Sequence, residues 1–305
     1  MQSYLTLVAG IACAALGGEF FVRGAVGIAR WARISPGIVA VTVAAFATSS
    51  PELSVAISSA LAGTPDIALG DALGSNVVNV ALILGVTLAI APVLSPRDTV
   101  RRDFPVAIAV PLVTALLVYD GVLSRLEGAA LFAGFVGWLT LAVREALRQR
   151  RASVDPATRP QHRRILLESG AGLGLLAVAG TLVVDGARGI ALSYGLDEFV
   201  IGATVVAVGT SVPELATAVT AKLRGHDEVG LGTILGSNLF NGLFIVSVAA
   251  MIHPIAIETR EVFSVLAFGT VAVALTMPAP DGTIHRSRGA LLLLLYAGFV
   301  LTMLV

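Results

Sequence analysis

The sequence is poor in charged residues, and no polar stretch in it is long enough to fold as a soluble domain. Charged residues make up 13% of the 305 positions, against 56% for hydrophobic residues, and the mean hydropathy is +0.89. A typical soluble chain carries a charged fraction of about 25%. The composition therefore predicts an integral membrane protein consisting of one membrane domain.

Cysteine and histidine are also scarce, and each scarcity excludes a kind of chemistry. Cys13 is the single cysteine, so the chain can form no internal disulfide and no thiolate metal site. The four histidines fall in predicted loops or at the ends of apolar stretches, which argues against a histidine proton relay within the membrane. We therefore expect no redox chemistry and no cofactor.

What the chain does have is a series of apolar stretches of membrane-spanning length, separated by short loops. About ten such stretches predict an all-α bundle of transmembrane helices. The first is too long for a signal peptide and lacks a basic start, so we expect it to be the first mature span. The predicted spans are 3–29, 35–62, 66–91, 103–119, 122–146, 165–191, 198–222, 229–252, 262–278 and 288–305.

Basic residues are distributed unevenly between the predicted loops. If the first loop faces the cytoplasm, 16 of the 20 Lys and Arg residues lie in cytoplasmic loops or at cytoplasmic helix ends. By the positive-inside rule, both termini are then predicted to face outward, from an inner (plasma) membrane. The arginine-rich segment 148–164 has two prolines and no apolar period, so we expect a cytoplasmic linker there.

The second half of the chain repeats the first at a shift of 162 residues. TSSPEL at 48–53 aligns with TSVPEL at 210–215, and GDALGSNVVN at 70–79 aligns with GTILGSNLFN at 232–241. Fifteen of the 32 residues from 48 to 79 are identical to their shifted partners. A shared apolar composition would not align the rare Pro, Glu and Asn residues.

Each half contains five predicted spans, an odd number, so the two halves must cross the membrane in opposite directions. We expect a first repeat at 1–147, the linker at 148–164 and a second repeat at 165–305. Inverted repeats with broken helices at matching places are typical of secondary transporters whose site lies near the membrane midplane. A duplication retained only for packing is the alternative.

Four predicted helices each carry two oxygen-bearing side chains in the middle of an apolar span. A spacing of four residues puts both members of a pair on one helix face. Pro51 and Pro213 should open their helices and free backbone carbonyls near 45–49 and 207–211. The pairs are Thr48 with Glu52, Ser75 with Asn79, Thr210 with Glu214, and Ser237 with Asn241.

These carboxylate, hydroxyl, amide and carbonyl oxygens are hard donors, which suit calcium or sodium rather than zinc or copper. Glu52 and Glu214 together supply two negative charges, which one divalent or two monovalent cations would neutralise. In an empty site the two carboxylates would repel each other, so protons should compete with the cation. A glutamate held by an arginine such as Arg23 is the structural alternative.

The repeated T-S-x-P-E, followed some twenty residues later by G-S-N-x-x-N, resembles the paired repeats of the calcium/cation antiporter superfamily. The likeness is to its prokaryotic sodium/calcium exchanger branch, and it covers essentially the whole chain. It implies the sodium/calcium exchanger fold, with ten helices in two inverted halves and a midplane site that calcium shares with sodium. It also implies that the first and sixth helices slide across the other eight to expose the site alternately.

The resemblance further implies roles for individual residues. Glu52 and Glu214 resemble the carboxylates of a calcium site, to which Thr48 and Thr210 add backbone carbonyls. Some relatives carry aspartate where this chain has Asn241, so a third negative charge is missing here. The positions that resemble the remaining ligands are Ser49, Ser75, Ser211 and Ser237, the carbonyls of Ala45 and Ala207, and, nearest the centre, Asn79 and Asn241.

We therefore predict a secondary antiporter, not an enzyme, that exchanges calcium for sodium without a covalent step. A proton-coupled divalent-cation antiporter of the same fold is the main alternative, although relatives of that type tend to have asparagine at the position of Ser49 and Ser211. A channel and an intramembrane enzyme fit the dense, duplicated ligand set less well. We expect membrane lipid and the transported cations as partners, with no nucleic acid, and we take the chain to work as a monomer.

Overall fold

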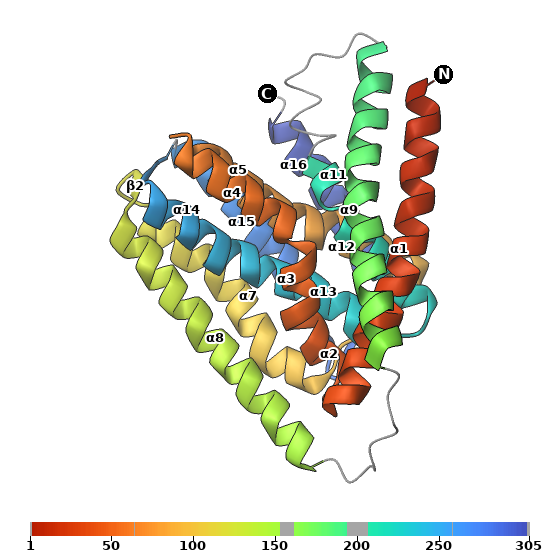
Figure 1. Ribbon diagram of the computed structural model, residues 1–305. Coiled ribbons are helices and arrows are strands. Elements are labelled where there is room, and N and C mark those ends of the chain that lie inside the picture. The colour runs from red at the N-terminus through yellow and green to blue at the C-terminus, as the bar shows by residue number, and fades with distance from the viewer. Residues whose placement is uncertain (1, 64, 153–161, 194–206, 258, 304–305) are drawn as a thin grey trace.

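The computed structural model describes residues 2–63, 65–152, 162–193, 207–257 and 259–303, and these residues form a helical bundle (Figure 1). The helices of the first half are α1 (Gln2–Ala32), α2 (Pro36–Val39), η1 (Ala40–Ala44), α3 (Ala45–Thr48), α4 (Ser50–Leu61), α5 (Pro65–Val77), η2 (Val78–Leu84), α6 (Gly85–Ile90), α7 (Arg97–Leu117) and α8 (Arg125–Ala152). Those of the second half are α9 (His162–Ser193), α11 (Ala207–Thr210), α12 (Val212–Leu223), α13 (Asp227–Leu239), η4 (Phe240–Ile245), α14 (Val246–Ile252), α15 (Thr259–Leu275) and α16 (Arg286–Met303).

The order of these helices follows the order of the predicted spans. Within the described residues, six helices are long and apolar enough to cross a membrane, and the bent pair Pro36–Thr48 and Ser50–Leu61 adds a seventh span. α7 corresponds to the span predicted at 103–119, but it begins earlier with several charged residues. α15 has the same length as the span predicted at 262–278, but it begins and ends three residues earlier. The span predicted at 198–222 begins outside the described residues and continues in α11 and α12.

The segment predicted as a linker at 148–164 is partly helical. α8 continues to Ala152, and α9 already begins at His162. Arginine, glutamine and alanine are good helix formers, so the spans extend into the basic sequence beyond their apolar ends. The middle of the segment, 153–161, lies outside the described residues. α1 begins and α16 ends at one end of the molecule, whereas α8 ends and α9 begins at the other (Figure 1).

Two short antiparallel ladders connect the halves. β1 (Val93–Leu94) pairs with β4 (Thr283–Ile284), and β2 (Val122–Leu123) pairs with β3 (Ile255–Ala256). β1 and β3 occupy equivalent positions in the two repeats, as do β2 and β4. Each ladder therefore joins one half to the other, which is the pattern expected of inverted repeats related by a pseudo-two-fold axis.

The turn glycines show the same symmetry. Gly63 and Gly225 have φ of +79° and +73°, and Gly121 and Gly282 have φ of +87° and +83°. Left-handed backbone of this kind favours glycine, because a Cβ atom would clash. Equivalent loops in the two repeats are thus built on equivalent glycines.

α1 and α9 pack along each other at one edge of the bundle (Figure 1). Glycine makes this close approach feasible: a Cβ on Gly17 would lie 3.1 Å from the carbonyl oxygen of Gly172, and one on Gly172 would lie 2.5 Å from the amide nitrogen of Phe21. Small residues allow helix backbones to approach closely in lipid. By contrast, α13 lies at the centre, and every residue from Val229 to Leu239 is buried.

Candidate ion-binding site

Two polar helices break at equivalent places. The helix that runs from α2 through η1 and α3 meets α4 at a bend of 45°. The break falls at Ser49, where φ is −85° and ψ is 11°. Its counterpart Ser211 has φ −87° and ψ 8°. Pro51 and Pro213 lie at the start of α4 and α12, where the missing amide hydrogen has no intrahelical partner to lose. The helices are therefore interrupted where proline predicted it.

Asn79 and Asn241 lie in wider helical turns that no residue pattern predicted. η2 and η4 are π-helical segments in the middle of their spans, and both asparagines are buried. Such turns shift backbone groups off the regular α-helical pattern and recur at functional sites. The two asparagines therefore lie on π-helical backbone, at equivalent positions of the two repeats.

The polar segments meet their counterparts from the opposite half. α4 packs against η4, and α12 packs against η2. Likewise, α3 packs against α13, and α11 packs against α5. Each acidic half-helix therefore contacts the asparagine-bearing segment of the other repeat, so that the site is assembled from both halves.

The two glutamates come together in the core of the bundle. Glu52 and Glu214 are each 1% exposed, and their carboxyl groups lie close enough to interact electrostatically. The remaining buried hydroxyl-bearing residues predicted for the site are Thr48, Ser49, Ser75, Ser211 and Ser237. The residues that the repeated motifs singled out are therefore removed from lipid.

A chain of hydroxyl groups links Glu214 to the first repeat. The Ser237 hydroxyl donates to Oε1 of Glu214 at 3.2 Å, and it lies 3.4 Å from the hydroxyl of Thr48. The hydroxyls of Thr48 and Ser49 also lie near the Glu214 carboxyl. Since Glu214 belongs to the second repeat, its surroundings combine residues of both.

The site is rich in buried polar atoms that have no hydrogen-bond partner. Among the described residues, one carboxylate oxygen of each glutamate, Oε2, is unpartnered. Buried polar atoms are normally paired, so a concentration of unpaired ones calls for a ligand or water. The other unpartnered atoms of the repeated motifs are Ser49 Oγ, Ser75 Oγ, Asn76 Oδ1, Asn79 Oδ1, Ser211 Oγ, and both Oδ1 and Nδ2 of Asn241.

No basic side chain neutralises either glutamate within the described part of the chain. The alternative that Arg23 holds one of them is wrong: Arg23 pairs with Glu19 at 2.5 Å, one turn away on α1. Glu19 also pairs with Arg224 at 2.7 Å. The two central carboxylates therefore lack a protein counter-charge among these residues.

The predicted backbone ligands have a mixed outcome. The carbonyl of Ala45 is not free, because it accepts a hydrogen bond from the Ser49 amide at 2.9 Å and from the Thr48 hydroxyl at 3.3 Å. The regular hydrogen bonding of the helix thus continues to Ser49, so the break comes one turn too late to free the Ala45 carbonyl. Ala207 and Thr210 lie in α11, but their side chains fall outside the description.

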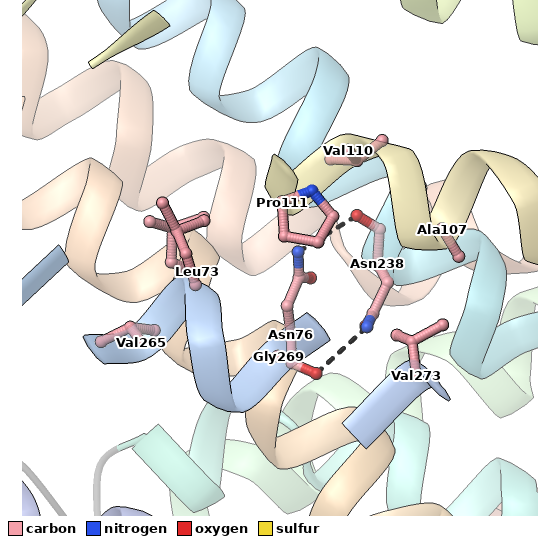
Figure 2. Close-up of a pocket in the computed structure, with 10 residues that line it drawn as sticks. Leu73, Asn76, Ala107, Val110, Pro111, Asn238, Val265, Gly269 and Val273 are labelled. Atoms are coloured by element: carbon pink, nitrogen blue, oxygen red, sulfur yellow. Dashed lines mark hydrogen bonds between the residues drawn. The ribbon is translucent and has the colours of Figure 1, made fainter. Parts of the chain in front are cut away.

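A pair of asparagines beside the site was missed as a structural feature. Asn76 and Asn238 are equivalent in the two repeats, and each donates from Nδ2 to the backbone carbonyl of the other, at 3.2 and 3.1 Å. Figure 2 shows the two side chains extending toward each other beside Pro111. Oδ1 of Asn238 also accepts from Asn79 at 3.1 Å. The repeated G-S-N in the sequence pointed to these two asparagines, but it did not predict that they contact each other.

This pair lies on the pseudo-two-fold axis. A hydrogen-bonded exchange between equivalent residues can occur only where a two-fold axis passes between them. A cavity of about 20 Å³ opens beside the pair, lined on its other sides by α7 and α15. Such a volume holds about one water molecule. The asparagines therefore fix how α5 and α13 cross at the centre of the molecule.

Comparison with known proteins identifies relatives that match this chain over most of its length. The family model described as sodium/calcium exchanger protein matches residues 2–144 and 166–305. The protein CaxA of Alkalimonas amylolytica is 37% identical over 295 residues, which cover 92% of this chain and 91% of that protein. The inner membrane protein YrbG of Escherichia coli is 34% identical over 257 residues, covering 81% of this chain and 79% of YrbG.

Solved structures agree with the sequence relatives. The sodium-calcium exchanger NCX_Mj, soaked with sodium and strontium, is 28% identical and superimposes with a TM-score of 0.84 over 97% of this chain and 96% of that one. The ten-helix fold with inverted repeats is thereby confirmed, as is a multi-pass membrane protein. The chain belongs to the sodium/calcium exchanger family, and it is a membrane antiporter rather than an enzyme.

Proposed function

We propose that this protein exchanges calcium for sodium across the membrane by alternating access, at a site built on Glu52 and Glu214. One observation carries the proposal: both carboxylates are buried, lie close enough to repel each other and keep an unpartnered oxygen, and no basic side chain among the described residues neutralises them. A buried carboxylate without a counter-charge is costly in a membrane and is usually retained to bind or relay an ion.

The donor set selects the class of ion. Every group from the motifs that meets at the site offers oxygen, as carboxylate, hydroxyl or amide, and hard cations such as calcium and sodium prefer such ligands. One calcium ion would balance the charge of the two carboxylates. We assign the site to Glu52, Glu214, Thr48, Ser49, Ser75, Asn79, Ser211, Ser237 and Asn241, with backbone oxygens of Ala207 and Thr210. The Ala45 carbonyl would join them as a ligand only by releasing the Thr48 hydroxyl, from which it accepts a hydrogen bond at 3.3 Å.

Sodium is the coupling ion that the motifs favour. Ser49 and Ser211 are buried, and the hydroxyl of each is unpartnered, so each can serve a small monovalent cation. Two of the relatives, NCX_Mj and MaX1 of Methanosarcina acetivorans, carry the name sodium/calcium exchanger. Protons should compete with the metal, because an empty site holds two repelling carboxylates. Proton coupling remains the rival function.

Alternating access would use the edge of the bundle formed by α1 and α9. These helices pack along each other through glycines, and α1 also crosses α12, where a Cβ on Gly18 would lie 2.9 Å from the carbonyl oxygen of Ala216. Glu214 lies half a turn before Ala216 on that helix. A pair of helices that moves as one unit across α12 would therefore open and close access next to the site.

The proposed topology follows from the arginine distribution. Residues 1–147 and 165–305 form the two repeats of a protein of the inner membrane. The segment 148–164 between them lies in the cytoplasm, and both termini lie on the outer side. α8 ends and α9 begins at the end of the molecule opposite to the termini (Figure 1), which supports this assignment. The ion gradients, and not the topology, set the direction of exchange: where the sodium gradient points into the cell, calcium would leave as sodium enters.

Calcium uptake into proteoliposomes tests the proposal. Vesicles loaded with sodium and diluted into sodium-free buffer at clamped pH should take up calcium, and a pH gradient without sodium should drive much less uptake. Glu52→Gln and Glu214→Gln should each reduce sodium-driven uptake by at least about a hundredfold, because each leaves a single buried charge for a divalent ion.

Glu145→Gln is the matched control. Glu145 is a partly exposed glutamate on α8 that pairs with Arg148 at 3.8 Å, far from the motifs in sequence, and its variant should transport normally. Uptake driven only by the pH gradient would assign the chain to the rival function. Undiminished uptake by both site variants would refute the site itself.

A further inference from the structure

Asp71 is a third acidic residue on a site-forming helix, and no motif-based assignment includes it. It lies on α5, six residues after the helix begins at Pro65, which is about 9 Å along the helix axis. Asp71, Ser75 and Asn79 follow one another at intervals of four residues, so their side chains form a ladder on one helix face. This ladder begins about 9 Å from the end of α5 that follows the turn at Gly63, and it runs toward the centre of the bundle.

The ladder has no acidic counterpart in the second repeat. Thr233 occupies the position equivalent to Asp71, is 0% exposed, and uses its hydroxyl to bond the Val229 carbonyl on its own helix at 2.9 Å. Asp71 is partly exposed, and it has no hydrogen-bond or ion-pair partner among the residues that the structure describes. At this pair of equivalent positions, only the first repeat therefore carries a carboxylate.

The carboxyl of Asp71 lies near the central site without joining it. Its carboxyl lies near enough to that of Glu52 to interact electrostatically. However, no three acidic, histidine or cysteine side chains in the described part of the chain converge on one point. Asp71 and the central glutamates are therefore not ligands of the same ion in this arrangement.

Ser75 lies between Asp71 and the centre. Its hydroxyl is 1% exposed and unpartnered, and it lies one turn further along the same face of α5. A buried hydroxyl without a partner, beside an unpaired carboxylate, provides hard oxygen donors for a small cation. The unpartnered Oε2 of Glu52 is a further such oxygen nearby.

We propose that Asp71 and Ser75 form an outer cation-binding position, which a sodium or calcium ion occupies between the aqueous phase at the 62–65 turn and the central pair. This inference rests on the function proposed above. Because Asp71 has no acidic equivalent, the position exists on one side of the protein only. A negative charge in a partly enclosed path raises the local concentration of cations and their rate of entry.

The test is sided exchange in Asp71→Asn and Asp71→Thr. Asparagine keeps the size of the side chain, and threonine is the residue that the second repeat carries at this position. The cation concentration for half-maximal exchange should rise roughly tenfold on the side of the 62–65 turn, in low salt, and remain unchanged on the opposite side. Asp71→Glu should restore most of the affinity.

Asp66→Asn is the control, since Asp66 is an exposed carboxylate in the first turn of the same helix. Right-side-out and inside-out vesicles allow exchange to be measured from each side of the membrane separately. The side of the turn is established independently, by the reaction of Asp66→Cys in a Cys13→Ala background with an impermeant maleimide.

Three results would overturn the outer position: unchanged affinity in both Asp71 variants, an equal loss on the two sides, or an equal loss in Asp66→Asn. If Glu52→Gln abolishes exchange while the Asp71 variants behave as wild type, the outer position fails and the proposed function stands. If Glu52→Gln and Glu214→Gln transport normally, the proposed function fails whatever Asp71 does. Equilibrium calcium binding to purified Asp71→Asn separates a folding defect from a loss of entry, because the central site should still bind.

Discussion

At the scale of single residues, Ser237 connects the two repeats at the site. Its hydroxyl donates to Glu214 within its own repeat and lies beside Thr48 of the other. A hydrogen bond to a charged group contributes about 1.5–3 kcal/mol. Ser237 is therefore expected to hold the Glu214 carboxylate in a position where its second oxygen remains available to a cation.

Ser237→Ala should weaken calcium binding by roughly tenfold to a hundredfold, since it removes that bond from a buried carboxylate. Calcium titration of purified protein in detergent measures the effect. Ser247→Ala is the control, because the Ser247 hydroxyl is also buried but donates at 2.7 Å to the Phe244 carbonyl on its own helix segment. Equal losses in both variants would show that Ser237 acts through general stability.

Most of the candidate site could be predicted at this scale, because an inverted repeat places equal residues around an axis. The glutamates, serines and asparagines follow from their duplication in the sequence. The pairing of Asn76 with Asn238 and the bonded carbonyl of Ala45 could not be predicted. Both depend on which helix faces meet and on where a broken helix resumes, and periodicity does not encode either.

At the scale of helices, close packing fixes the position of the broken segments. A Cβ on Gly236 would lie 2.5 Å from the Val41 carbonyl oxygen and 2.6 Å from the Ala45 Cβ. α13 therefore rests directly on η1 and α3, the segments that lead into the break at Ser49. Gly232 and Gly236 allow this contact, because small residues let helix backbones approach closely in lipid.

Gly236→Ala should lower the free energy of unfolding by about 1–3 kcal/mol and displace Ser237, because the added methyl group overlaps backbone atoms. Thermal unfolding and calcium titration in detergent provide the measurements. In Gly137→Ala, the methyl group falls at an exposed position on α8 where the described structure leaves open space, so stability should be unchanged or slightly higher. A Gly236→Ala variant as stable as wild type would contradict this contact.

The elements themselves were predicted with uneven success. Apolar length located the spans, and proline located both breaks. The π-helical turns at Asn79 and Asn241 were missed because the two segments share no proline or glycine at equivalent positions: only η4 contains a glycine, Gly242. The helical ends of the basic segment were missed because its prolines suggested a loop, although the residues flanking them favour helix.

At the scale of the whole molecule, duplication with inversion generates the site. The cross-paired strands, the equivalent turn glycines and the exchanged asparagine bonds all express one pseudo-two-fold axis. That axis brings two acidic half-helices together in the interior of the bundle, each against the other repeat. Family membership accounts for the fold, whereas this assembly is the basis of the proposed ion site.

Equilibrium calcium binding to the purified protein tests the joint role of Glu52 and Glu214 most directly. We predict that the wild-type chain binds one calcium ion, in competition with sodium, and that Glu52→Gln and Glu214→Gln each weaken this binding by at least about a hundredfold. Glu145→Gln should bind as wild type. Calcium binding of wild-type strength in either site variant would contradict a site that both carboxylates share.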